Sequence, residues 1–166
     1  RPRAHRTRAS SGSALRAALL CALACGCGGA HAAAVGSSHA PPAEGPVELS
    51  LVTSDGARVE LASQRGGVVL LFVVSTYDGV CQAAIRPVSS FTISHLDTVV
   101  LGVVAQPDAE TFAGLYAETF APPFTVTYEP EGTIALGTSD LGAFEAVPTF
   151  VMLDGFGVIA DTHVGW

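Results

Sequence analysis

The stretch from Val69 to Cys81 reads Val-Leu-Leu-Phe-Val-Val-Ser-Thr-Tyr-Asp-Gly-Val-Cys. Its first six residues are all apolar and lack the alternation of a strand with one exposed face, which predicts a strand buried on both faces. From Cys81 onward, apolar residues recur at a helical spacing: Ala84, Ile85, Val88 and Phe91. The sequence therefore predicts a buried strand, a short turn and a helix, with Asp78 and Cys81 in the first helical turn.

The pair Asp78 and Cys81 is the first candidate site. A cysteine in the first turn of a helix can be activated, because the free amides and the helix dipole stabilise a thiolate. An aspartate three residues earlier is a good N-cap, but its negative charge disfavours the thiolate. Two interpretations of Cys81 follow: a small, partly buried apolar residue, or a single reactive thiol.

The rest of the chain from residue 47 onward alternates strand and helix patterns. Residues 47–51 and 58–61, joined by an Asp-Gly turn, predict a β-hairpin. A helix is expected to open at Pro107–Glu110, with acids in its first turn. Further strands are expected at residues 98–105, 124–128 and 158–164, and another apolar strand is expected to open at Pro148, because a proline cannot donate to the ladder and sits at a strand's start. This order of elements predicts an α/β sandwich.

Two of these segments carry a family resemblance. Residues 69–81 resemble the active-site strand of thioredoxin-like proteins, closest to the TlpA-like and AhpC/TSA-type redoxins, which are thiol–disulfide oxidoreductases. That strand ends in Ala-Thr-Trp-Cys-Gly-Pro-Cys in the family, so Asp78 stands here at the position of the nucleophilic cysteine. Residues 146–154 are similar to the family segment Gly-Val-Pro-Thr-x-x-x-x-Asp. Over residues 47–166 the resemblance implies a thioredoxin-like sandwich, with a central mixed sheet flanked by helices and an N-terminal β-hairpin.

The resemblance also implies roles for individual residues. Pro148 would be a cis-proline facing the active-site turn, and the backbone of Val147 would pair with a substrate peptide. Tyr77 is assigned to the same substrate-binding surface. Exchange in this family needs two thiols, and only the second, Cys81, is present. We therefore expect a redox-degenerate member that binds a peptide or protein partner in a groove between Asp78–Cys81 and Val147–Pro148; the alternative is a single-cysteine thiol oxidoreductase or peroxidase that uses Cys81.

The first 46 residues predict export. Residues 1–27 combine a basic, serine-containing start with a short apolar run, which is typical of an export signal. Cys25 and Cys27 each follow a small residue, as the lipidated cysteine of a bacterial lipoprotein does, whereas cleavage after Ala32 would release a soluble secreted form. Residues 28–46 are rich in Gly, Ala, Ser and Pro and are expected to form a flexible tether. The expected location is the periplasm, with a lipid anchor in a membrane, or the exterior after secretion.

Composition excludes some functions and leaves others open. From Glu44 onward the chain has fifteen acids against three arginines and no lysine, a net charge of −12, which argues against a nucleic-acid partner. Cys81 is the single cysteine beyond the leader, so neither a disulfide within the domain nor a multi-cysteine metal site is expected, and no cofactor is implied. A site joining Cys81 and Asp78 with His95 or His163 would be poor for a soft metal, and His95 is expected to end the helix that begins near Cys81. The final helix that closes the family's sandwich is expected to be missing after Trp166.

Overall fold

The computed structural model describes residues 42–166. The expected signal, both candidate lipidation sites at Cys25 and Cys27, the alternative cleavage point after Ala32 and most of the expected tether lie outside the described residues. Among the helices of the described part, none has the length and apolarity needed to cross a bilayer.

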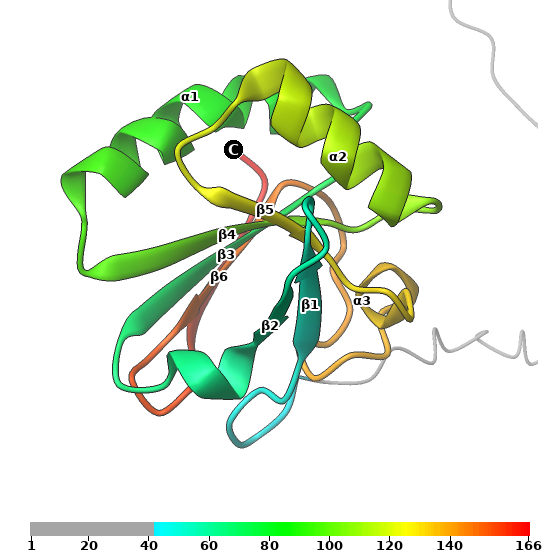
Figure 1. Ribbon diagram of the computed structural model, residues 1–166. Coiled ribbons are helices and arrows are strands. Elements are labelled where there is room, and N and C mark those ends of the chain that lie inside the picture. Colours follow the sequence, from blue (N-terminus) through cyan, green and yellow to red (C-terminus); the bar gives the residue numbers. More distant parts are fainter. Residues whose placement is uncertain (1–41) are drawn as a thin grey trace, which may run out of the picture. The chain divides into compact units, whose positions relative to one another are not determined.

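Seven strands form one mixed sheet in the order β2-β1-β5-β4-β3-β6-β7 (Figure 1). Its central strands β3, β4 and β5 are parallel, and every other pairing is antiparallel. The strands are β1 (Ser50–Thr53), β2 (Arg58–Glu60), β3 (Val68–Val74), β4 (Thr98–Val104), β5 (Thr125–Tyr128), β6 (Thr149–Leu153) and β7 (Ile159–Val164). The carboxyl ends of β3, β4 and β5 therefore meet at one edge of the sheet, where the loops that carry function in open α/β sheets are found.

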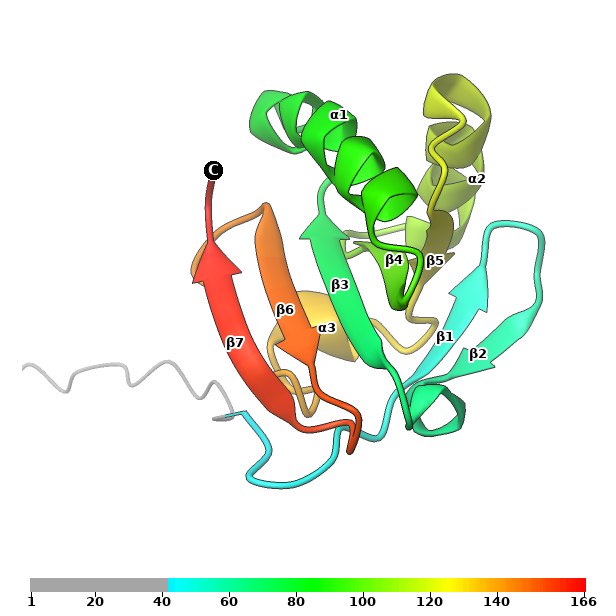
Figure 2. The same cartoon turned by 90° about the vertical axis from the view of Figure 1, so that its left-hand side faces the viewer.

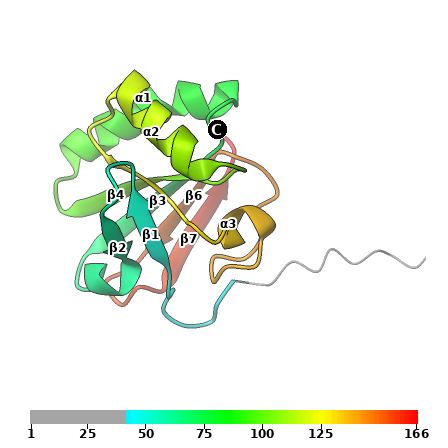
Figure 3. The same cartoon turned by 45° about the vertical axis from the view of Figure 1, so that its right-hand side comes forward.

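Helices cover both faces of this sheet. The two long helices, α1 (Gly79–Ser94) and α2 (Ala109–Phe120), lie on one face (Figure 2). The other face is covered by a 3₁₀ helix (Leu61–Gln64), by α3 (Thr133–Leu136) and by the chain around Val47. Figure 3 shows α3 from a third direction. The expectation of a thioredoxin-like α/β sandwich with a central mixed sheet is confirmed.

Strand β3 is buried on both faces, as its unbroken apolar run predicts. Leu70, Phe72 and Val74 pack beneath α1 and α2, while Val69, Leu71 and Val73 belong to the core on the opposite face. Side chains alternate between the faces of a strand, so a strand between two cores must be apolar at every position.

The hairpin is present, but its first strand begins later than the sequence suggests. Residues 47–49 are not part of β1; the amide of Val47 instead donates to the carbonyl of Gly157 at 2.8 Å. At the end of the expected tether, the amide of Ala43 donates to the carbonyl of Asp140 at 2.9 Å. The 3₁₀ helix and α3 were not expected, because four residues are too few to produce a helical pattern of apolar residues.

Gly102 in β4 offers a test of this packing. A Cβ at this position would lie 2.8 Å from Cε2 of Phe124, a buried ring in the core beneath α1 and α2. We expect Gly102→Ala to lower the free energy of unfolding by about 1–3 kcal/mol, the usual cost of overpacking a core. Gly114→Ala, in an unobstructed position within α2, should instead stabilise the chain by up to about 1 kcal/mol. Urea unfolding of both variants measures the contrast, and equal effects would contradict the position of Phe124.

Candidate functional site

Asp78 caps the N-terminus of α1. Its backbone is extended (φ −86°, ψ 124°), and its Oδ1 accepts a hydrogen bond of 2.8 Å from the amide of Cys81. This bond satisfies one of the amides that have no partner in the first turn of a helix. The same amide is the main cause that lowers the pKa of Asp78 below its ordinary value. Asp78 is therefore a charged helix cap, as the sequence predicts.

Cys81 is a buried thiol. Its side chain is 0% exposed and belongs to the core formed by α1, α2 and the sheet, which also contains Phe72 of β3 and Tyr116 of α2. Burial, and then the neighbouring carboxylate of Asp78, raise the pKa of the Cys81 thiol to about 11. The Tyr116 hydroxyl is also buried, and burial is the main cause that raises its pKa. The N-terminus of α1 thus holds a thiol that is protonated and inaccessible at neutral pH.

The segment before β6 lies beside the end of β3. Val73 pairs with Thr149, which places Pro148 next to the turn that leads from β3 into α1. The Val147–Pro148 peptide bond is cis, as the resemblance implied. Tyr77 is 73% exposed, whereas Val147 is partly buried and contacts both cores. The fold therefore brings the Asp78–Cys81 and Val147–Pro148 segments to one edge of the sheet.

Gln106 is a residue of this edge that the sequence analysis missed. It follows β4, and its Oε1 accepts a 2.7 Å hydrogen bond from the amide of Thr76 and a 3.1 Å bond from the Thr76 hydroxyl. Ser75 Oγ lies 3.3 Å from the same oxygen. Gln106 thus fixes the turn that carries Tyr77 and Asp78. Its position after a parallel strand was the one available signal, and no motif distinguishes it.

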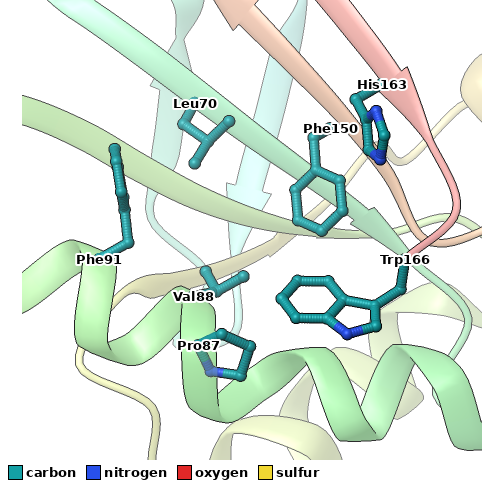
Figure 4. Close-up of a pocket in the computed structure, with 7 residues that line it drawn as sticks. All are labelled: Leu70, Pro87, Val88, Phe91, Phe150, His163 and Trp166. Atoms are coloured by element: carbon teal, nitrogen blue, oxygen red, sulfur yellow. The ribbon is translucent and has the colours of Figure 1, made fainter.

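An apolar cavity lies farther along α1. It has a volume of about 470 Å³, and neither Asp78 nor Cys81 lines it. Its walls come from α1, from the sheet and from the end of the chain (Figure 4): Leu70, Pro87, Val88, Phe91, Phe150, His163 and Trp166.

The two histidines considered as metal ligands lie apart from Cys81. His163 lines the apolar cavity, and His95 ends α1, with its Nδ1 3.0 Å from the carbonyl of Phe91. His95 thus occupies the helix end where the sequence placed it. Within residues 42–166, no group of three or more His, Cys, Asp or Glu side chains is arranged to hold a metal ion.

Solved structures with this fold are thioredoxin-like proteins. The exposed lipoprotein thioredoxin Etrx1 of Streptococcus pneumoniae matches with a TM-score of 0.61 at 21% identity, over 72% of this chain and 90% of that one. StoA of Bacillus subtilis matches with a TM-score of 0.59 at 15% identity, over 72% and 89% of the two chains. A Chlorobium tepidum protein, provisionally described as the thiol:disulfide interchange protein DsbE, matches at 0.61 with 20% identity, over 76% and 88%. At these identities the matches show the fold alone, which is the thioredoxin-like fold.

The family is shown by the sequence. The Redoxin family model matches residues 34–166, which include every described element, and the chain belongs to the redoxin family. No curated protein sequence matches the chain.

Proposed function

We propose that this redoxin acts outside the cytoplasm by binding a polypeptide, without dithiol turnover. The binding edge is formed by Tyr77–Cys81, at the start of α1, and by Val147–Pro148, before β6. Asp78 stands where the family has its nucleophilic cysteine, and a carboxylate has no redox couple with which to open a disulfide. The exposed ring of Tyr77 offers a surface to a partner at this edge.

The observation that carries the proposal is the state of Cys81. A thiol attacks a disulfide or a peroxide as the thiolate, and the attacking sulfur must be reachable. The Cys81 sulfur is enclosed by the core, and its pKa of about 11 leaves it protonated at neutral pH. A single-cysteine oxidoreductase or peroxidase would need an accessible sulfur and a thiol pKa low enough to give the thiolate at neutral pH. We therefore favour polypeptide binding.

The proposed location rests on the leader and on one structural relative. Residues 1–27 have the composition of an export signal, and Cys25 and Cys27 are both candidates for lipidation. Etrx1, which shares the fold, is described as an exposed lipoprotein. We propose that the domain is held at a membrane surface by such an anchor and meets its polypeptide partner there; cleavage after Ala32 would give a secreted form.

Alkylation of Cys81 tests this proposal. Iodoacetamide should modify Cys81 on the order of a hundredfold more slowly than a cysteine in an unstructured peptide, because its pKa is about 11 rather than the ordinary 9.0. Since the thiolate is the reacting form, the rate should rise about tenfold for each pH unit up to the pKa. Mass spectrometry of the peptide that contains Cys81 measures its rate separately from those of Cys21, Cys25 and Cys27.

The control is the same measurement in denaturant. Unfolding should bring the rate for Cys81 to that of the reference peptide, since burial is the main cause of the raised pKa. Rapid alkylation of the folded chain at pH 7, with an apparent pKa below 8.5, would contradict the proposal and favour the one-thiol enzyme.

A further inference from the structure

A second polar site lies beside the proposed binding edge. The turn from β4 into α2 and the turn from β5 into α3 enclose a cavity of about 320 Å³. Its walls are Gln106, Pro107, Asp108, Ala109, Glu110, Tyr128, Glu129, Pro130, Glu131 and Gly132. Four of these residues are acidic and none is basic. The cavity is therefore suited to a cationic group.

Hydrogen bonds within the chain leave part of this negative charge free. The Glu129 carboxylate accepts hydrogen bonds from the amides of Glu131 and Thr133, so both of its oxygens are already used within this turn. Asp108 precedes α2 with φ 55°, a conformation in which its side chain makes no bond to the helix amides. The carboxylate of an N-cap aspartate ordinarily accepts hydrogen bonds from those amides. The carboxylate of Asp108 is thus available to a ligand.

Gln106 adds an unsatisfied donor to the same cavity. Its side chain is 6% exposed, and its Nε2 is buried without a hydrogen-bond partner among residues 42–166. Its Oε1 is held by Thr76, and its side chain lines the cavity, so a rotation of the side chain that exposes Nε2 would present this donor to a ligand there. A buried donor without an acceptor costs free energy, which a ligand acceptor such as a peptide carbonyl would recover.

The charge of the whole domain favours the same kind of ligand. Fifteen acids and three arginines follow residue 43, so a cationic partner is attracted from a distance. Of the three arginines, Arg65 forms an ion pair with Glu48. The Nη1 atom of Arg58 lies 3.9 Å from Oε1 of Glu60. Arg58 lines the neighbouring cavity, which shares Glu129 and Glu131, and its Nη1 donates to Ser50 there.

We propose that the cavity between Gln106, Asp108, Glu110 and Glu131 is a subsite for a lysine or arginine residue of the bound polypeptide. The carboxylates receive the cationic side chain, and the Gln106 amide donates to a backbone carbonyl of the same partner. Gln106 also fixes Thr76, so this subsite is continuous with the Tyr77–Cys81 edge. The inference rests on the proposed function, because it assumes that a polypeptide lies along that edge.

Two matched peptides test the subsite on the full chain labelled with ¹⁵N. The first is a capped octapeptide of alanine and serine with two lysines, and the second has glutamine in place of both lysines. The lysine peptide should bind about five- to tenfold more tightly at low salt, the sum of two exposed ion pairs, and should shift the side-chain amide signal of Gln106. Asp108→Asn with Glu131→Gln should abolish the preference, whereas the control, Asp97→Asn with Glu118→Gln, removes two exposed charges outside the cavity and should retain it.

The possible results separate this inference from the proposed function. Equal binding of the two peptides, unchanged by Asp108→Asn with Glu131→Gln, would overturn the subsite and leave polypeptide binding standing. Absence of binding by both peptides at millimolar concentration would overturn both. Spermine carries amines without a carbonyl, so an equal shift of the Gln106 amide by spermine would overturn the assignment to a polypeptide.

Discussion

Phe72→Ala is expected to lower the free energy of unfolding by about 3–5 kcal/mol, the range for removing a buried aromatic ring. Phe72 is 0% exposed at the centre of β3. Its ring stacks on Phe150 of β6 at 5.2 Å between centroids and meets the edge of Phe124 at 5.9 Å. The three rings pack against one another in the core between the sheet and helices α1 and α2. A domain of this size has a total stability of about 5–15 kcal/mol, so the loss is large.

Urea unfolding followed by circular dichroism measures the effect, with Phe156→Ala as the control. Phe156 is 78% exposed in the turn before β7, and its replacement should change stability by less than about 0.5 kcal/mol. If Phe72→Ala fails to fold, Phe72→Leu keeps most of the volume and should cost roughly 1–1.5 kcal/mol. A cost for Phe72→Leu as small as that for Phe156→Ala would contradict the central position of this ring.

The fold could be predicted because its signals are local. Both faces of β3 are buried, so residues 69–74 had to be apolar throughout, and Asp78 could be identified as a cap from its spacing to Cys81. The short elements could not be predicted in the same way. The α3 helix has four residues and one buried side chain, Ile134, which gives no helical period to detect.

The site was only partly predictable, for a related reason. The positions of Asp78 and Pro148 follow from sequence motifs, and the structure brings them to one edge of the sheet. Gln106 acts through contacts with Thr76, thirty residues earlier, and lines a cavity that its own turn forms with the turn from β5 into α3. Such contacts depend on which strands are neighbours, and no local pattern reports them. The complete burial of Cys81 likewise depends on α2, which contributes Tyr116.

Asp78→Cys is expected to create a thiol–disulfide oxidoreductase from this scaffold. A thiol at the first position of the turn would meet the free amides of α1 and the positive end of its dipole, which lower the pKa of such thiols to about 3.5–7.5. Its thiolate fraction at pH 7 should exceed that of Cys81 on the order of a thousandfold. Loss of the Asp78 carboxylate also removes one cause of the high pKa of Cys81. Cys81 could then resolve the mixed disulfide that the new thiol forms with a substrate.

Reduction of insulin by dithiothreitol measures this gain, with Cys21, Cys25 and Cys27 replaced by serine in every variant. The parent should show the uncatalysed rate, and Asp78→Cys should accelerate precipitation of the insulin B chain. Asp78→Ser removes the same charge without supplying a thiol and should stay at the uncatalysed rate. Asp78→Cys with Cys81→Ser should form mixed disulfides with the substrate without turnover, because no resolving thiol remains. Activity in the parent equal to that of Asp78→Cys would show that this redoxin already performs thiol chemistry, and binding without turnover would no longer describe it.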